Sequence, residues 1–360
     1  MKMLHLIATF NPGGAEKLFI EMSNNFNQDP SIELDVLILK KMSSKFLDQL
    51  SFLGINILNP ISKNLYDIKH IKHLSLIINN YDLIQVHLSQ AFYYLYFSKL
   101  LTRSQTKIVF TEHNVTNKRR EMFFFKFIEK FVYKKYDKIV CITEEVKNSL
   151  SNHTKNENNF IVIENGIDIN TYKNADQITS LDFVNFKDVV ICQVSSFTKQ
   201  KDQITVIKAL KYLDKKIKLI LVGDGPERGN CEKLVKALNL ENRVIFTGIR
   251  IDVPSIMKSS TINVLSSAYE GLPLAALEAM STGNAFLASN VPGINTLITN
   301  QKLLFKFSSE NSLSDKINLL LCNSDLYKEN VEIALKISNK YGLKKMINKY
   351  KECYSQVLKL

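Results

Sequence analysis

Short apolar runs rich in Val, Ile and Leu alternate with longer segments of helical periodicity along almost the whole chain. This alternation is typical of α/β domains with parallel sheets, because each buried strand is followed by a helix that covers one face of the sheet. The spacing of apolar residues predicts helices over 15–26 and 65–78, among others. The expected strands lie at 3–9, 33–39, 82–88, 107–113, 137–143 and 160–166 in the first half, and at 188–196, 217–225, 243–249, 261–267 and 284–290 in the second.

The alternation is interrupted by a polar, weakly patterned stretch over 168–182. A chain of 360 residues also exceeds one typical domain. We therefore expect a first domain over 1–172, a second over 183–340 and an amphipathic C-terminal helix over 341–360. Both domains have the pattern of Rossmann-like sheets, whose ligands bind beyond the carboxyl ends of the strands. The cleft between the two domains is the expected site.

Composition and charge narrow the class of protein. With 45% hydrophobic and 23% charged residues, the chain is expected to be neither disordered nor membrane-spanning, and residues 1–14 resemble a buried strand and a turn more than a signal peptide. Five scattered cysteines without a C-x-x-C pair argue against a disulfide framework or a metal site, so we expect the reducing cytoplasm. The net charge of +12 favours anionic partners, but the sequence contains no nucleic-acid-binding motif. The expected partners are therefore anionic membranes or phosphorylated small molecules.

The segment over 269–279, YEGLPLAALEA, carries the clearest chemical pattern. Gly271 allows a ligand to approach the backbone closely, and Pro273 suits the first turn of a helix. The free N–H groups that follow the proline form an anion site aided by the helix dipole. Glu278 lies further along this helix among apolar neighbours, where its carboxylate can accept hydrogen bonds from a vicinal diol. The plain alternative is a surface helix with a proline start and two solvated acids.

Two more strand ends carry basic residues or glycine. Residues 194–202, VSSFTKQKD, place Lys199 and Lys201 at the carboxyl edge of the second sheet, and residues 221–228, LVGDGPER, place a glycine turn there. A lysine beside a helix N-terminus suits a diphosphate, since its point charge adds to the backbone donors. Taken alone, Lys201 is equally well explained as an ordinary solvated side chain.

The segment over 269–294, YEGLPLAALEAMSTGNAFLASNVPGI, resembles the donor-site signature of the retaining glycosyltransferases of family 4. Six further motifs follow the family's order: GGAEK (13–17), TEHN (111–114), DKIVCITEEVK (137–147), ENGID (164–168), QKD (200–202) and VGDGPE (222–227). Each motif is weak alone, but together they span nearly the whole chain. The resemblance implies an α/β protein with the GT-B fold. That fold has two Rossmann-like domains facing each other across a deep cleft, with a C-terminal helix that crosses back to the N-terminal domain.

The resemblance also implies roles for named residues of the second domain. Glu278 would hydrogen-bond the ribose of a nucleotide-sugar donor, and Glu270 would contact the donor sugar near the reacting carbon. The amides around Leu274 and Ala275, together with Lys201, would hold the diphosphate and stabilise its leaving charge. The remaining implied donor contacts are Gly271, Gly223 and Lys199.

In the first domain the resemblance implies a role for the glycine loop and one histidine. Gly13 and Gly14 would let the loop approach the phosphate and the acceptor, and His113 would lie near the transferred sugar. A lone histidine at a strand end is otherwise usually structural, which is how we interpret His87.

The implied reaction is transfer of a sugar with retention at its anomeric carbon. The protein would position the reactants and stabilise the departing diphosphate, which would help to deprotonate the acceptor hydroxyl. We expect a nucleotide-sugar donor, with UDP the most frequent nucleotide in the family, and a lipid-linked saccharide acceptor in surface polysaccharide or glycolipid synthesis. Neither a metal nor another cofactor is expected.

Two positions depart from the family pattern. Ser196 stands where many members have an arginine that shares the diphosphate, and either Lys199 or Arg250 is available to compensate. Residues 290–293, NVPG, replace a frequent double glycine, although Gly293 keeps the close backbone approach.

Residues 118–138, KRREMFFFKFIEKFVYKKYDK, combine basic and aromatic side chains. On a helix Phe124, Phe127, Ile128 and Phe131 share one face, which favours core packing with a basic outer face. The alternative is peripheral contact with an anionic membrane, at its cytoplasmic face. Residues 89–101, SQAFYYLYFSKLL, have the same ambiguity.

Three other functions compete with the transferase. A nucleotide-sugar 2-epimerase shares the two-domain fold, although the EGLPLAALE and TEHN segments speak against it. A dehydrogenase would rest on Gly223, Gly225 and Gly229, a weak glycine pattern without a convincing ribose-binding acid. A non-catalytic sugar-nucleotide-binding assembly protein stays open because Ser196 replaces the arginine.

Overall fold

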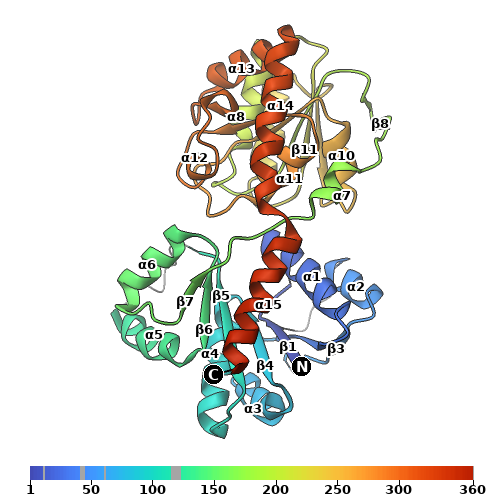
Figure 1. Cartoon of the computed structure of the whole chain (residues 1–360). Coiled ribbons are helices and arrows are strands. Elements are labelled where there is room, and N and C mark those ends of the chain that lie inside the picture. The colour runs from blue at the N-terminus through green and yellow to red at the C-terminus, as the bar shows by residue number, and fades with distance from the viewer. Residues whose placement is uncertain (11–12, 41–44, 61, 115–122, 360) are drawn as a thin grey trace. The chain divides into compact units, whose positions relative to one another are not determined.

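The computed structural model describes residues 1–10, 13–40, 45–60, 62–114 and 123–359. They form two compact units, one of Met1–Asn165 with Lys344–Leu360 and the other of Gly166–Leu343. Figure 1 shows the C-terminal segment in red beside elements of the blue-to-green first unit. The division comes earlier than the expected end of the first domain at 172, because Ile167 and Tyr172 are buried in the core of the second unit.

The first unit contains, among its described residues, a seven-stranded sheet whose neighbouring strands all run parallel. The six strands expected in this half are confirmed. The strand not expected from the sequence is β3, none of whose three residues is fully buried, so it does not belong to a run of buried apolar residues. The order is β3 (Asn56–Leu58), β2 (Glu33–Ile38), β1 (Lys2–Ile7), β4 (Leu83–His87), β5 (Lys107–Glu112), β6 (Lys138–Cys141) and β7 (Phe160–Val162).

Helices cover both faces of this sheet. Phe26 of α1 contacts Tyr354 of α15, so these two helices share one face, and on the other face Phe110 of β5 packs against Phe92 of α4 and Tyr133 of α5. Alternate residues of each strand point to opposite faces, so both faces of the sheet contribute to the core. The helices are α1 (Gly14–Asn27), α2 (Lys45–Phe52), α3 (Lys69–Ile77), α4 (Ser89–Thr102), α5 (Phe123–Lys135), α6 (Glu144–Thr154) and α15 (Leu343–Lys359).

The C-terminal helix α15 is anchored to the first unit by buried hydroxyl groups. The Tyr350 hydroxyl lies 3.0 Å from Thr111 Oγ1, and the Tyr354 hydroxyl donates to Gln85 Oε1 at 3.0 Å. Lys351 forms an ion pair with Asp29, just beyond α1. These contacts explain how a segment so distant in sequence completes the first unit.

The second unit contains a six-stranded parallel sheet. The five strands expected here are confirmed, and the two-residue β15 is the addition. The order is β12 (Val244–Gly248), β11 (Lys218–Val222), β10 (Val190–Val194), β13 (Ile262–Leu265), β14 (Ala285–Ser289) and β15 (Leu304–Phe305).

Two hydrophobic cores lie on the two faces of this sheet, and successive residues of β10 alternate between them. Val190 and Cys192 belong to one core and Ile191 to the other. The polar stretch over 168–182 is part of this unit, with the helix α7 and the hairpin strands β8 (Ser180–Leu181) and β9 (Val184–Asn185). The helices are α7 (Ile169–Lys173), α8 (Gln203–Ala209), α9 (Arg228–Ala237), α10 (Val253–Ser259), α11 (Leu274–Ser281), α12 (Ile294–Leu297), α13 (Glu310–Cys322) and α14 (Ser324–Ser338).

Candidate functional site

The loops at the carboxyl edge of the second sheet are tied to one another by backbone hydrogen bonds. The loop after β10 meets the loop after β13, where the Asp202 amide donates to the Ser266 carbonyl at 3.0 Å and the Ala268 amide donates to the Gln200 carbonyl at 2.8 Å. The loop after β14 meets the same loop through the Glu270 amide, which donates to the Pro292 carbonyl at 3.1 Å. Three separate loops thus form one continuous polar edge.

An ion pair lies within this edge. Lys201 Nζ contacts Glu270 Oε1, and the Ser267 hydroxyl donates to the same oxygen at 2.6 Å. The side chains are largely buried, with 18% of Lys201 and 7% of Glu270 exposed. Partial burial strengthens such an interaction, because less water screens the charges. The structure therefore brings together two predicted site residues, and adds Ser267, for which the sequence carries no specific signal.

Two glycines are required by the close approach of the loops. Gly293 has φ +82°, and a Cβ there would overlap the backbone carbonyl of Glu270. Gly223 has φ +129°, and a Cβ there would overlap the backbone carbonyl of Ser195. A side chain is disfavoured at both positions by sterics as well as by φ. The predicted site residue Gly223 thus has a clear role in shaping the loops.

The helix α11 begins at Leu274, and Pro273 is its N-cap with φ −76° and ψ 92°. The expectation that Pro273 occupies the first helical turn is therefore wrong by one position, because its ψ is extended. The amides of Leu274 and Ala275 have no intrahelical acceptor at a helix start and can donate to a ligand. Glu278 is buried in the next turn, with only 7% exposed, which excludes the alternative of a solvated surface acid.

The basic residues considered as substitutes for an arginine at position 196 differ in their surroundings. Ser196 is exposed, and its carbonyl accepts a hydrogen bond from Gln203 Nε2 at 3.0 Å. Arg250 is held by Asp252 through two hydrogen bonds of 2.8 and 2.6 Å. Lys199 is exposed to solvent in the loop after β10. Of these two cations, Lys199 is the one without a carboxylate holding it in place.

The predicted residues of the first unit lie at the carboxyl edge of its own sheet. Gly13 caps α1 and is exposed, as is Gly14, the first residue of that helix. Glu112 ends β5 and accepts hydrogen bonds from the Asn114 amide at 3.1 Å and the Tyr133 hydroxyl at 3.0 Å. These two bonds fix the turn that carries His113, which is partly buried.

Three histidine rings lie beside one another on neighbouring strands, with His5 on β1, His87 at the end of β4 and His113 just after β5. His87 lies 5.5 Å from His5 and 6.1 Å from His113, measured between ring centroids. Burial lowers the pKa of His5 to about 3 and that of His113 to about 4, and desolvation also holds the pKa of His87 well below its usual value. All three imidazoles are therefore neutral at pH 7. Among the described residues none offers a hydrogen-bond partner to their Nε2 atoms.

The aromatic segment over 118–138 falls partly outside the described residues. Residues 118–122 are among those not described, and α5 starts at Phe123. Phe131, expected to face the core, is 66% exposed, whereas Val132, Tyr133 and Tyr136 are buried. The helix is therefore rotated relative to the expectation, since Tyr133 packs against Phe92 of α4 and Tyr136 stacks on the same ring.

Family models match both halves of the chain. Residues 12–171 match the model of Glycosyltransferase Family 4, and residues 181–336 match that of Glycosyl transferases group 1. The matched segments contain all of the predicted site residues. The two Rossmann-like units of the structure agree with the GT-B fold. The chain is a GT-B glycosyltransferase of family 4.

Relatives of this glycosyltransferase are themselves glycosyltransferases. The UDP-Gal:alpha-D-GlcNAc-diphosphoundecaprenol alpha-1,3-galactosyltransferase of Escherichia coli is 26% identical over 358 residues, covering 90% of each chain. The N-acetyl-alpha-D-glucosaminyl L-malate synthase of Bacillus anthracis is 26% identical over 64% of this chain and 62% of its own. Among solved structures, HepE of Anabaena in complex with UDP and glucose superposes with a TM-score of 0.83, at 20% identity and 99% coverage of both chains.

Two further findings concern membranes and metals. Within the described ranges, no helix of the glycosyltransferase has the length and apolar character needed to cross a membrane. The same part of the chain holds no group of three or more His, Cys, Asp or Glu residues arranged to bind a metal ion.

Proposed function

We propose that this glycosyltransferase moves a sugar from a UDP-sugar to a hydroxyl of a lipid-linked saccharide, with retention at the anomeric carbon. The observation that carries the proposal is the cluster of Lys201, Glu270 and Ser267 beside the N-terminus of α11. A cation and free backbone amides at one sheet edge suit the two charges of a diphosphate. The proposed role in surface polysaccharide or glycolipid synthesis follows from the proposed acceptor, a lipid-linked saccharide.

In the proposed reaction the bond between the anomeric carbon and the diphosphate oxygen breaks as the bond to the acceptor oxygen forms on the same face. The acceptor's proton passes to the departing diphosphate. Lys201 and the amides of Leu274 and Ala275 stabilise the charge that develops on that leaving group. Glu270 contacts the transferred sugar, and its link to Lys201 couples sugar and diphosphate recognition. The chemistry in this proposal uses no metal and no further cofactor.

The remaining predicted residues have supporting roles in the proposal. Glu278, buried in α11, accepts hydrogen bonds from the ribose hydroxyls. Gly271 and Gly223 allow the backbone to approach the donor, and Lys199 adds positive charge beside the diphosphate.

The first unit is assigned to the acceptor and the sugar being transferred. Gly13, Gly14 and His113 lie at the carboxyl edge of its sheet, where ligands of such sheets bind. His113, neutral at pH 7, can donate one hydrogen bond and accept another, as recognition of a sugar hydroxyl requires. The name of the E. coli relative, whose acceptor is a diphosphoundecaprenol-linked sugar, supports the lipid-linked class.

The first test is release of UDP from a panel of UDP-sugars in the presence of diphospholipid-linked saccharides. We expect release only with both substrates, and a product whose anomeric configuration, measured by NMR, matches that of the donor. GDP- and ADP-sugars serve as the nucleotide controls. Undiminished transfer in excess EDTA is expected. An inverted product would overturn the retaining reaction, and loss of transfer in EDTA would overturn its independence of metal.

The second test is the pair Glu270→Gln and Glu232→Gln. Glu232 is a matched control, because it also pairs with a cation, Arg228, but on the exposed surface of α9. We expect Glu270→Gln to lower kcat about 100-fold, which corresponds to about 2.7 kcal/mol, and Glu232→Gln to leave it unchanged. Equal activity of both variants would remove Glu270 from the reaction. Interconversion of the donor without any acceptor would instead identify an epimerase.

A further inference from the structure

The carboxylate of Glu270 is bonded through one of its two oxygens. Oε1 accepts hydrogen bonds from Lys201 Nζ and from the Ser267 hydroxyl, whereas Oε2 has no hydrogen-bond partner among the residues that the structure describes. The Glu270 side chain is nevertheless only 7% exposed. An ionised carboxylate accepts hydrogen bonds on both oxygens, so Oε2 is the atom left for a ligand.

The two groups that hold Oε1 differ in how firmly they fix its direction. The Lys201 ammonium is a point charge on a flexible stem, and its donors can rotate to a new acceptor. In the proposed reaction it also binds the diphosphate, which competes with the carboxylate for it. The Ser267 hydroxyl is on a short and fully buried side chain, so its 2.6 Å bond to Oε1 gives the carboxylate a defined orientation.

Ser267 is itself held by a side chain from the neighbouring strand. The backbones of β13 and β14 are paired as far as Leu265 and Ala288. Beyond that point the hydroxyl of Ser289, the last residue of β14, accepts from the Ser267 amide at 2.9 Å and donates to the Ser267 carbonyl at 2.7 Å. One fully buried hydroxyl therefore binds both polar groups of the Ser267 backbone.

Lys201 is positioned by a separate set of hydrogen bonds. The Asp202 carboxylate, next in the chain, accepts from the Ser266 hydroxyl at 3.0 Å, and the Asp202 amide donates to the Ser266 carbonyl at 3.0 Å. Loss of the hydroxyl of Ser267 or Ser289 removes none of these bonds. The two partners of the Glu270 carboxylate can therefore be perturbed one at a time.

We propose that Ser267 and Ser289 are positioning residues, which keep Glu270 Oε2 directed at the transferred sugar while Lys201 binds the diphosphate. Ser267 acts through Glu270, and Ser289 acts through Ser267. Without the Ser267 hydroxyl the carboxylate is free to rotate, and a smaller fraction of the protein has Oε2 in the productive orientation. The inference rests on the proposed function, because it takes Glu270 to contact the transferred sugar.

The first test is Ser267→Ala, alone and together with Glu270→Ala. We expect Ser267→Ala to lower kcat about tenfold, as loss of a hydrogen bond to a charged group does, while UDP binds with unchanged affinity. In the Glu270→Ala background it should cause no further loss, because the group that Ser267 positions is already absent. Steady-state kinetics measure transfer, calorimetry measures UDP affinity, and thermal unfolding establishes that each variant is folded.

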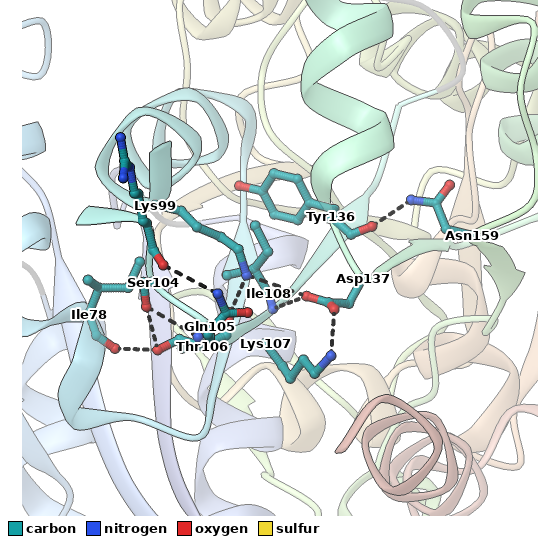
Figure 2. A network of polar contacts seen from close by, with 11 residues as sticks. Ile78, Lys99, Ser104, Gln105, Thr106, Lys107, Ile108, Tyr136, Asp137 and Asn159 are labelled. Atoms are coloured by element: carbon teal, nitrogen blue, oxygen red, sulfur yellow. Dashed lines mark hydrogen bonds and ion pairs between the residues drawn. The ribbon is translucent and has the colours of Figure 1, made fainter. Parts of the chain in front are cut away.

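The second test is Ser289→Ala, with Ser104→Ala as its matched control. Figure 2 shows Ser104 beside Thr106, where its hydroxyl donates to Thr106 Oγ1 at 2.9 Å and accepts from the Thr106 amide at 3.2 Å. This buried serine resembles Ser289 in giving and accepting one bond with a single residue, but it precedes β5 at the amino edge of the first sheet. We expect Ser289→Ala to lower kcat a few-fold with UDP affinity unchanged, and Ser104→Ala to leave kcat unchanged.

Four results would overturn the inference. They are an unchanged kcat in Ser267→Ala, an equal loss from Ser267→Ala with and without the Glu270 side chain, an equal loss in the variants of Ser289 and Ser104, and a loss of UDP affinity as large as the loss of kcat. The last would show general damage to the donor site. Failure of the proposed function is recognised separately, since the unchanged chain would then transfer no sugar from any UDP-sugar, which removes the basis of both proposals.

Discussion

The carboxyl edges of the two sheets are built differently. In the second unit, the loops are joined by backbone hydrogen bonds, two glycines without room for a side chain, and the pair of Lys201 and Glu270. In the first unit, the edge presents an exposed glycine pair at α1 and the partly buried His113. All six histidines of the chain belong to the first unit, and the second has none.

The difference indicates how the two halves divide their work in the proposed reaction. A nucleoside diphosphate presents the same charges whatever sugar it carries, so a site of fixed loops and backbone donors suits it. Acceptors differ in shape and polarity, so fewer features of the first unit are set by the reaction itself. Four measurements test this difference between the two units.

The largest effect is expected from Gly293→Ala. A Cβ at this position overlaps the Glu270 carbonyl and the residue has φ +82°, so the loops after β13 and β14 must separate. We expect a loss of about 3 kcal/mol in the free energy of unfolding and no measurable binding of UDP. Gly229→Ala is the control, because nothing lies within 4 Å of its added Cβ. Calorimetry measures UDP binding by both variants. Normal binding of UDP by Gly293→Ala would show that the donor site does not depend on the close contact between the loops after β13 and β14.

The next effect is expected from Lys201→Ala. This lysine is paired and mostly buried, whereas Lys199, two residues earlier, is exposed. We expect Lys201→Ala to lower kcat/KM about 100-fold, or about 2.7 kcal/mol, and Lys199→Ala to lower it only a few-fold. Steady-state kinetics compare them. A larger loss with Lys199→Ala would mean that the exposed lysine takes over the role of the arginine absent at Ser196.

A smaller effect is expected on the stability of the protein at acidic pH. The histidines that cause it lie in the first unit. The folded-state pKa values of His5 and His113, about 3 and about 4, lie below the unfolded value of 6.5. At a pH between the folded and unfolded pKa values, these histidines are protonated in the unfolded chain but not in the folded one. The free energy of unfolding therefore decreases as the pH falls from about 7 to about 5, by up to about 2 kcal/mol per histidine.

Urea unfolding at both pH values measures this loss. His5→Leu should retain a smaller pH dependence than the unchanged chain, because one titrating ring is gone, whatever the variant's stability at pH 7. An identical pH dependence in both proteins would show that His5 is not a source of the acid sensitivity.

The smallest effect is expected from Tyr350→Phe in α15. Its hydroxyl lies 3.0 Å from Thr111 Oγ1 in a buried contact, so its removal should lower the free energy of unfolding by about 1 kcal/mol. Tyr212→Phe, at an exposed position of the second unit, is the control and should change nothing. Equal stability of the two variants would show that the hydroxyl contact does little to hold α15 on the first unit.

Much of the fold could be predicted from the sequence. Strands with several consecutive buried apolar residues are visible in a single chain, because both faces of a parallel sheet are covered. The two-residue β15 is too short to give such a pattern, and none of the three residues of β3 is fully buried. The outward position of Phe131 was missed for another reason: helical periodicity gives a face, and contacts with α4 decide which face is buried.

The class of fold and the strand ends that carry the chemistry can be inferred from the amino-acid order alone, since both depend on local patterns along the chain. Three features become visible only in the three-dimensional structure: Lys201 pairs with Glu270, Ser267 joins them, and His87 lies between the rings of His5 and His113. The exposure of Phe97, Leu100 and Leu101 on α4 is likewise visible only in the structure. Partner choice and burial are properties of packing between distant segments, and no local pattern specifies them.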